Sequence, residues 1–227
     1  EPLTGLPADR PGHNHTIQLQ PGSTTNDLPA TKVHRISPEE MQELQRQITE
    51  YLEQGWIRHA ANAWACPVVF ARKASGALRL CLDYRGLNKH TKRANFPIPH
   101  IDSILDSLGK SKIFSSLDLT HGFHQVKMDE ASIPYTSFQS HLGQFEWYVM
   151  PFGLVNSPAT YQRFINSVVE PWKRPYVVCY LDDILIHSPD VDSHLIGLEE
   201  ILSLLEAADL KIRLEKSSIG RMSLDYL

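Results

Sequence analysis

The chain has 227 residues, of which 42% are hydrophobic and 21% charged, which is ordinary for a globular protein of one large or two small domains. No apolar run reaches the roughly 18 residues of a membrane span, and the three scattered cysteines exclude a disulfide framework and lack the spacing of a zinc site. The net charge of −4 is uneven, because the segment from Arg58 to Arg93 carries eight bases and one acid, and so is +7 against −11 for the rest. A local basic patch is compatible with phosphate binding, although on charge alone a solvated basic face is the commoner explanation.

The first half of the chain predicts an arm, a helix and a hairpin. Residues 1–36 are rich in Pro, Gly, Asn and Thr and predict an extended arm, with a short strand at HTIQLQ. SPEEMQELQRQITEYLEQG predicts an amphipathic helix with Ser37 as its N-cap, a capping box completed by Glu40, and a glycine at its end. Two strand-like runs, ACPVVFARK and ALRLCLDYR, are joined by KASG and predict a hairpin with Lys73 and Arg79 near its tip.

The second half alternates strands and helices. IPHIDSILDSLGKS predicts a short helix, KIFSSLDL a strand with Asp118 near its end, and SPATYQRFINSVVEPW a helix capped by Ser157. YVVCY and ILIHS predict two strands around a tight connection, VDSHLIGLEEILSLLEAADL a helix, and KIRLEKSSI the start of a further strand. Helices on one face of a mostly antiparallel sheet give an α+β fold.

Two adjacent aspartates, Asp182 and Asp183, interrupt the apolar hairpin, and Asp118 ends another strand of the same expected sheet. Unpaired carboxylates held together in a turn are costly, and a divalent cation removes that cost. Mg²⁺ suits such a site because it takes a few carboxylate oxygens, waters and substrate phosphates. Three carboxylates at one sheet edge are the minimum for two-metal phosphoryl transfer. The dipeptide alone is more typical of an ordinary turn, but its apolar flanks argue against a plain exposed one.

Several blocks occur in one order along nearly the whole chain: LPADRPGHNHTIQL, AWACPVVFARK, RLCLDYRGLNKHT, SSLDLTHGFHQVKM, MPFGLVNSPATYQRFIN and YLDD. This ordered set resembles the reverse transcriptases of gypsy-type long-terminal-repeat retrotransposons. The resemblance implies an α+β right-hand polymerase fold with fingers, a palm whose antiparallel sheet is backed by helices, and no thumb. It implies an extended arm at 1–36, mainly fingers at 37–115, and mainly palm at 116–227, with part of the fingers returning around 129–150.

The resemblance also implies that the chain is cut from a polyprotein. SLDYL at its end looks like the start of the next hairpin of the family, so we expect truncation before a thumb and an RNase H domain. Protease and integrase are the other domains expected in the full-length product. The family works inside the cell, and we expect a cytoplasmic enzyme in virus-like particles, with no membrane partner.

The three aspartates are the catalytic residues that the resemblance implies. Asp118, Asp182 and Asp183 would bind two Mg²⁺ ions, or Mn²⁺ in their place, and the carbonyl of Leu119 would assist. Each ion would neutralise charge on the transferred phosphate or on the attacking oxygen.

Further residues are implied to contact the substrates. Those that would bind the incoming dNTP are Lys73, Arg79, Phe123, Phe152 and Gly153. Those that would contact the template or the primer are Arg85, Pro158 and Tyr180. Lys216 would donate a proton to pyrophosphate, and Phe123 would exclude a ribose 2′-hydroxyl. Ordinary surface positions for Arg79 and Lys216, and packing for Phe123 and Tyr180, stay open as alternatives.

The resulting hypothesis is an RNA-directed DNA polymerase domain that joins dNTPs to a primer 3′-hydroxyl on an RNA or DNA template. The alternative is a catalytically inactive nucleic-acid-binding remnant or structural module. A metal-dependent nuclease is a third hypothesis, but no base for an attacking water is evident. Two departures from the family pattern leave the metal ligands intact: KASG lacks the usual Asp of the fingers turn, and Tyr135 stands where Lys is common.

Overall fold

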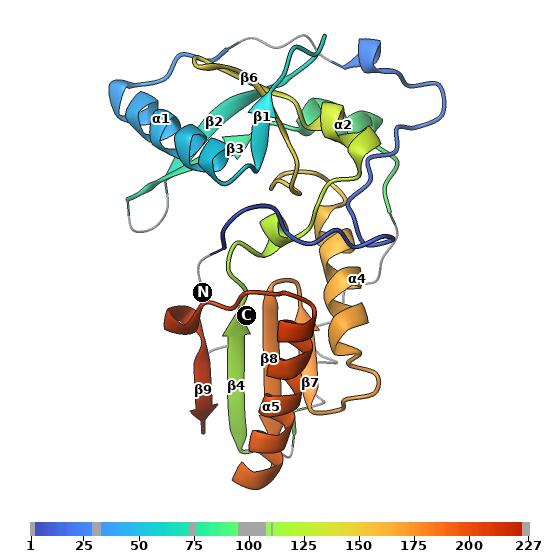
Figure 1. Cartoon of the computed structure of the whole chain (residues 1–227), viewed down its shortest axis with the longest axis vertical. Coiled ribbons are helices and arrows are strands. Elements are labelled where there is room, and N and C mark those ends of the chain that lie inside the picture. The colour runs from blue at the N-terminus through green and yellow to red at the C-terminus, as the bar shows by residue number, and fades with distance from the viewer. Residues whose placement is uncertain (1–2, 29–32, 73–75, 95–107, 110, 224–227) are drawn as a thin grey trace. The chain divides into compact units, whose positions relative to one another are not determined.

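The computed structural model describes residues 3–28, 33–72, 76–94, 108–109 and 111–223 (Figure 1). Internal contacts divide the chain into two compact units. The N-terminal unit comprises Thr4–Ala94 and Phe123–Ser157. The C-terminal unit comprises Asn95–Gly122 and Pro158–Leu227, together with Glu1–Leu3. Each unit therefore combines segments that are far apart in the sequence.

The N-terminal unit contains a five-stranded sheet. Its strands, in spatial order, are β1 (Ile57–His59), β6 (Gly143–Trp147), β5 (Phe138–Ser140), β2 (Cys66–Arg72) and β3 (Leu78–Leu82). All neighbours are antiparallel except β2 and β5, which run parallel. Its described helices are α1 (Pro38–Glu53) and α2 (Arg85–His90), with 3₁₀ turns at Thr25–Asp27 and Glu130–Thr136 and a third, Gly122–Gln125, that belongs to this unit from Phe123 on. The predicted hairpin of β2 and β3 is confirmed, and the central residues of its KASG turn lie outside the described residues.

Helix α1 begins and ends as its sequence predicts. The Ser37 side chain accepts from the backbone N–H of Glu40, whose carboxylate accepts from the backbone N–H of Ser37. At the other end, Gly55 adopts a φ of +69°, which glycine reaches without the steric penalty of a Cβ. The backbone N–H of Trp56 then donates to the carbonyl of Tyr51 at 2.9 Å, so the final carbonyls of the helix are satisfied.

The N-terminal arm packs along its unit, but the predicted strand at HTIQLQ is wrong. Two isolated bridges occur instead, His15 with Met128 and Leu19 with Thr91. Between them the backbone N–H of Ile17 donates to the Ser132 hydroxyl at 2.9 Å. No ladder forms in this segment because its backbone groups bond to different parts of the unit in turn.

The C-terminal unit contains a four-stranded, fully antiparallel sheet. Its strands, in spatial order, are β7 (Val177–Tyr180), β8 (Asp183–Ser188), β4 (Ile113–Asp118) and β9 (Ser218–Arg221). Among its described residues, the helices are α5 (Val191–Ala207), which packs against β4 and β8, and α4 (Ser157–Val169), which belongs to this unit from its second residue on (Figure 1). The α+β fold with helices on a mostly antiparallel sheet is confirmed. None of the helices that the structure describes is long and apolar enough to cross a membrane.

In this unit one predicted strand starts later than expected, and one predicted helix falls on residues that are not described. The strand predicted to start in KIRLEKSSI begins only at Ser218, near the end of that segment, because a 3₁₀ turn forms first at Leu214–Lys216. The short helix predicted from IPHIDSILDSLGKS falls almost entirely outside the described residues.

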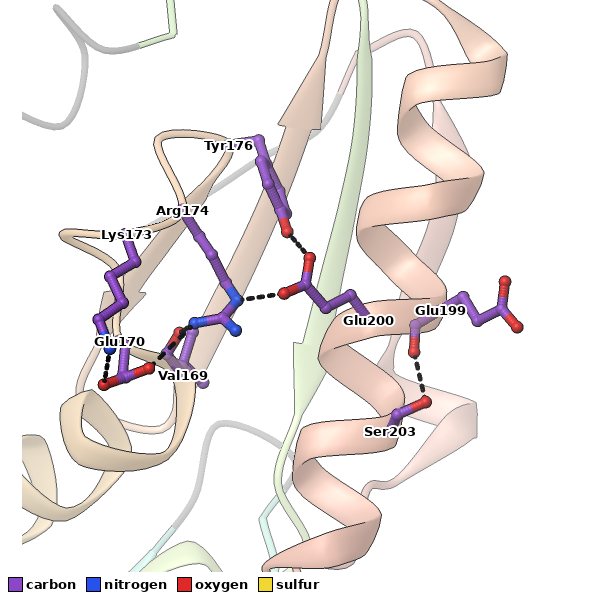
Figure 2. A network of polar contacts seen from close by, with 8 residues as sticks. All are labelled: Val169, Glu170, Lys173, Arg174, Tyr176, Glu199, Glu200 and Ser203. Carbon is purple, nitrogen blue, oxygen red and sulfur yellow. Dashed lines mark hydrogen bonds and ion pairs between the residues drawn. The ribbon is translucent and has the colours of Figure 1, made fainter.

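A polar network joins the end of α4 to α5 within the C-terminal unit (Figure 2). Arg174 donates to the carbonyl of Val169 at 2.9 Å and to the carboxylate of Glu200 at 2.8 Å. The hydroxyl of Tyr176 also donates to Glu200, and burial together with this carboxylate raises the pKa of Tyr176 to about 12. Gly197 lets the Tyr176 ring lie against the helix, since a Cβ there would come within 2.9 Å of the ring. The network therefore fixes the connection that leads into β7.

Candidate active site

The C-terminal sheet brings the first and last predicted metal ligands directly opposite one another. In the antiparallel register of β4 and β8, Asp118 pairs with Asp183. Asp183 also pairs with Tyr180 across the β7–β8 hairpin, so that only Leu181 and Asp182 form the turn. Like charges directly opposite on neighbouring strands are destabilising. The sheet therefore holds an arrangement of carboxylates that is unfavourable for folding alone.

The pKa of Asp183 is raised by burial and by this crowding of carboxylates. Partial burial raises the pKa of the Asp183 carboxyl, and the negative charges of Asp182 and Asp118 raise it further. Each of these causes disfavours the ionised form, and a nearby cation would favour it. The three side chains thus affect one another at a partly buried sheet end.

The chemistry of these donors fits Mg²⁺, which prefers carboxylate oxygens and keeps part of its shell for water and phosphates. Within the described ranges, no three His, Cys, Asp or Glu side chains converge closely enough to form a ready metal cluster. Repulsion among ionised carboxylates opposes closer approach until a cation lies between them. Asp118, Asp182 and Asp183 are the residues that would hold such an ion.

The end of β4 is anchored by the segment that precedes β9. The backbone N–H of Arg213 donates to the carbonyl of Asp118 at 2.8 Å, and the N–H of Asp118 donates to the Ser217 hydroxyl at 3.1 Å. Leu119 and Ile212 form an isolated antiparallel bridge. The two hydrogen bonds of this bridge are made by the residues on either side of the pair, so neither of them uses the Leu119 carbonyl. Asp118 is therefore held at both its N–H and its carbonyl.

Lys216 precedes Ser217 in this anchoring segment and is exposed. The Ser217 hydroxyl accepts from the backbone N–H of Asp118 and donates to the carbonyl of Arg213 at 2.8 Å. The segment that carries Lys216 thus lies beside the end of β4. Pro158 lies in the first turn of α4 in the same unit and is half-buried.

The N-terminal unit brings three of the predicted nucleotide-binding residues together. The rings of Phe123 and Phe152 stack with centroids 4.8 Å apart and an interplanar angle of 25°. Gly153, which follows, has a φ of +96°, and a Cβ on it would come within 3.2 Å of the Leu82 carbonyl. Asn88 donates to the carbonyl of Gly153 at 2.9 Å. Both its conformation and its close packing therefore require glycine at 153.

Two of the predicted basic residues of this unit, Arg79 and Arg85, have exposed side chains. Arg79 lies opposite Ala71 in the β2–β3 hairpin and is exposed. Arg85 is 85% exposed along its side chain and forms an ion pair of 2.6 Å with Asp83. Lys73 lies outside the described residues. Arg79 and Arg85 thus present charge at the surface of the unit.

Comparison with known proteins supports the fold and shows the family of the chain. The sequence pattern of the family described as "Reverse transcriptase (RNA-dependent DNA polymerase)" matches residues 71–227. The chain belongs to the reverse transcriptase family. Among curated relatives, the Retrovirus-related Pol polyprotein from transposon 297 of Drosophila melanogaster is 37% identical over 94% of this chain. Transposon Tf2-3 polyprotein of Schizosaccharomyces pombe is 35% identical over 85% of it.

Solved reverse transcriptases share this fold. The foamy viral protease-reverse transcriptase in complex with dsDNA matches 99% of this chain and 45% of its own, with a TM-score of 0.86 and 26% identity. The same enzyme in complex with an RNA/DNA hybrid matches 91% of this chain and 27% of its own, with a TM-score of 0.81 and 26% identity. The chain spans only 21% of the transposon 297 polyprotein and 14% of the Tf2-3 polyprotein.

Two further residues of the chain touch the carboxylate turn and were missed by sequence reasoning. Gly122 lies against Tyr161 and Asp182, since a Cβ on it would be 2.8 Å from the Tyr161 hydroxyl oxygen and 3.4 Å from the Asp182 Cβ. Gln162, fully buried on α4, hydrogen-bonds to the backbone of the β7–β8 hairpin. A polar residue beside Tyr161, on the same helical face as Ile165, was the available signal for Gln162.

Proposed function

We propose that this chain forms the fingers and palm of an RNA-directed DNA polymerase from a gypsy-type long-terminal-repeat retrotransposon. The observation that carries the proposal is the register of Asp118 opposite Asp183, with Asp182 adjacent in the turn, within a reverse transcriptase fold. Two carboxylates directly opposite on neighbouring strands, Asp118 and Asp183, do not stabilise the sheet, because like charges in a cross-strand pair repel one another. A role in binding cations and phosphates explains why this arrangement is present.

The residues of the C-terminal unit would fix the reacting groups. When bound by Asp118, Asp182 and Asp183, two Mg²⁺ ions (or Mn²⁺) would supply charge neutralisation for attack of a primer 3′-hydroxyl on the α-phosphate. The carbonyl of Leu119 is free of the neighbouring bridge to assist as a ligand. The chain's own contribution is position, because the backbone bonds of Asp118 hold its carboxylate at a set place. Tyr180, paired with Asp183, would contact the primer end, and Lys216 would donate a proton to pyrophosphate.

The residues of the N-terminal unit, together with Pro158 of the C-terminal unit, would bind the incoming dNTP and the template. The Phe123–Phe152 stack offers an apolar surface for the sugar and base, and Gly153 allows close approach of the backbone. Arg79, with Lys73, would bind the triphosphate, since guanidinium groups bind phosphate oxygens bidentately. Arg85 and Pro158 would contact the template strand. Complexes of the foamy viral enzyme with dsDNA and with an RNA/DNA hybrid support nucleic acid as the partner.

The wider setting is proposed from the relatives, which are polyproteins. Protease, RNase H and integrase domains would accompany this chain in the full-length product. Reverse transcription would take place in the cytoplasm, in virus-like particles. In the same proposal the fingers end near residue 115, the palm follows, and part of the fingers returns around residues 129–150.

The test is primer extension on an RNA template by the full-length protein with Mg²⁺ and dNTPs. Asp182→Asn keeps the shape of the side chain and removes its charge, so we expect incorporation to fall by about 100-fold or more. Asp192→Asn, an exposed acid-to-amide change on α5, is the matched control and should keep wild-type activity. Extension that survives Asp182→Asn, or salt-sensitive nucleic-acid binding without incorporation by the wild type, would overturn the proposal.

A further inference from the structure

The turn that carries Asp182 has a backbone conformation that its sequence does not favour. Leu181, the first of the two residues between β7 and β8, has a φ of +53°. A side chain with a Cβ is disfavoured there, because the Cβ approaches the following carbonyl oxygen. Hairpin loops of two residues normally place Gly, Asn or Asp at positive φ. Leu181 therefore needs contacts from elsewhere in the fold to stay in this conformation.

Gln162 on α4 supplies such contacts. Its side-chain oxygen accepts from the backbone N–H of Leu181 at 2.7 Å, and its side-chain NH₂ donates to the carbonyl of Cys179 at 3.0 Å. Residues two apart in a strand direct their backbone groups to the same edge. The N–H of His187 on β8 donates to the carbonyl of Tyr176, so the alternate groups at Cys179 and Leu181 face the open edge of the sheet, away from β8. The amide of Gln162 thus bonds to β7 as the backbone of a further strand would.

The orientation of the Gln162 amide is determined by its partners. The second hydrogen of its NH₂ donates to the side-chain oxygen of Asn166, one helical turn away, at 2.9 Å. Turning the amide over would direct its NH₂ at the N–H of Leu181 and its oxygen at the carbonyl of Cys179. With the residue completely buried, those unmade hydrogen bonds would be costly. Gln162 is therefore held in one geometry by three hydrogen bonds.

We propose that Gln162 is a positioning residue of the active site. By holding Leu181 in its left-handed conformation, it sets the direction in which Asp182 and Asp183 leave the turn. The inference rests on the proposed polymerase function, because it concerns the same carboxylates. It assigns Gln162 no contact with substrate, only the conformation of the turn.

The first arm of the test replaces Gln162 with Met in the full-length protein. Methionine has a similar volume and cannot make the three hydrogen bonds. We expect kcat for primer extension to fall by about 10-fold to 100-fold, as for other small displacements of reacting groups. The KM for dNTP should hardly change, because the proposed dNTP-binding side chains lie on the N-terminal unit. Ser167→Ala, at an exposed position of the same helix, should leave both constants unchanged.

The second arm separates positioning from a general loss of stability. Glycine adopts positive φ without steric cost. Leu181→Gly in the Gln162→Met background should therefore restore kcat at least tenfold toward the wild-type value. A merely structural role predicts the reverse, because glycine further loosens an already weakened hairpin. An unchanged kcat in Gln162→Met, or a double variant less active than the single one, overturns the inference.

The third arm does not depend on polymerase activity. Hydrogen exchange of the Leu181 amide should be slow in the wild type and in Ser167→Ala, and at least tenfold faster in Gln162→Met. Equal exchange in Gln162→Met and the wild type would overturn the inference even if primer extension worked. A wild type that fails to extend primers would refute the proposed function, and the exchange result would still decide the role of Gln162.

Discussion

The two units hold their candidate functional residues in different ways. In the C-terminal unit, Asp118 and Asp183 are set by the backbone register of β4 and β8, and the N–H and carbonyl of Asp118 are bonded to the segment before β9. In the N-terminal unit, Arg85 and Phe152 reach outward on exposed side chains, 85% and 56% exposed. Exposed side chains adapt to a ligand at low cost, whereas backbone register cannot shift by less than a residue.

This contrast has a kinetic consequence. Loss of an interaction made only in the transition state lowers kcat, while loss of uniform substrate binding raises KM. Substitutions that disturb the packing around the C-terminal carboxylates should therefore act on kcat. Substitutions on the exposed face of the N-terminal unit should act on KM. Variants on each side of this division test it.

The largest effect is expected from Gly122→Ala. The new Cβ would lie 2.8 Å from the Tyr161 hydroxyl oxygen and 3.4 Å from the Asp182 Cβ, so the surrounding groups must move. Overpacking of this kind costs about 1–3 kcal/mol of the free energy of unfolding. Displacement at Asp182 should lower kcat by about 100-fold. Urea denaturation and steady-state primer extension measure the two effects.

Tyr161→Phe tests whether the clash is the cause. It removes the hydroxyl that the new Cβ would meet first, although the ring carbon behind it would still be 3.1 Å away. The double variant Gly122→Ala/Tyr161→Phe should therefore recover part of the lost kcat. If the double variant is as impaired as Gly122→Ala alone, the contact with Tyr161 does not carry the effect.

A buried histidine, His194, bridges β4 and β8, the two strands that carry Asp118 and Asp183. Nε2 of His194 on α5 lies 2.7 Å from the Ser115 hydroxyl of β4, and its Nδ1 lies 2.9 Å from the Ser188 hydroxyl of β8. Ser188 donates its one proton to the carbonyl of Asp190, so it accepts from Nδ1–H. In the neutral imidazole with its proton on Nδ1, Nε2 accepts from the Ser115 hydroxyl, which itself accepts from the N–H of Gly220. Protonation of Nε2 would remove the acceptor of the Ser115 proton, so the neutral imidazole fits this chain of hydrogen bonds best.

The stability of the C-terminal unit should therefore fall in mild acid. Burial lowers the pKa of His194 below its usual 6.5, and burial together with the charge of His194 lowers that of His187. The unfolded chain then binds more protons than the folded one, so stability is full above pH 6.5 and is lost as pH falls below it. Urea midpoints measured from pH 8 to pH 5 follow this loss.

His194→Gln isolates the titrating group. At pH 8 it should cost about 1–3 kcal/mol, because the buried serine hydroxyls lose partners. Its further loss between pH 7 and pH 5 should be smaller than in the wild type, since one of the two buried histidines no longer titrates. Leu195→Gln places the same side chain at the adjacent exposed position and should keep the wild-type slope. An unchanged slope in His194→Gln would contradict the assignment.

Local signals account for the elements that the sequence predicted correctly. Helix α1 carries its own start and end at Ser37, Glu40 and Gly55, so no distant contact is needed to place it. The β7–β8 hairpin follows from two apolar runs around a short polar turn, and the register of Asp118 with Asp183 follows once β4 lies beside it. The three aspartates were thus accessible from spacing and chemistry together with the family resemblance.

Distant contacts account for what the sequence did not show. The start of β9 is delayed by a 3₁₀ turn whose neighbour Ser217 bonds to Asp118, 99 residues earlier in the chain. The parallel pairing of β2 with β5 likewise joins segments with no local signal for one another. Gln162 carried a signal, a polar residue on an apolar helical face, but its partners at Cys179 and Leu181 depend on the folded hairpin.

The smallest effect is expected from Phe152→Leu in the N-terminal unit. Leucine keeps an apolar side chain but loses the stack on Phe123, and such aromatic pairs contribute about 0.5–1.5 kcal/mol. If this stack forms part of the dNTP surface, the KM for dNTP should rise about 2-fold to 10-fold with kcat unchanged. Leu142→Ala, at an exposed position of the same unit, is the control and should change neither constant. A fall in kcat with constant KM would mean that Phe152 affects the reacting groups, and the division between backbone-held and side-chain-held residues would fail at this position.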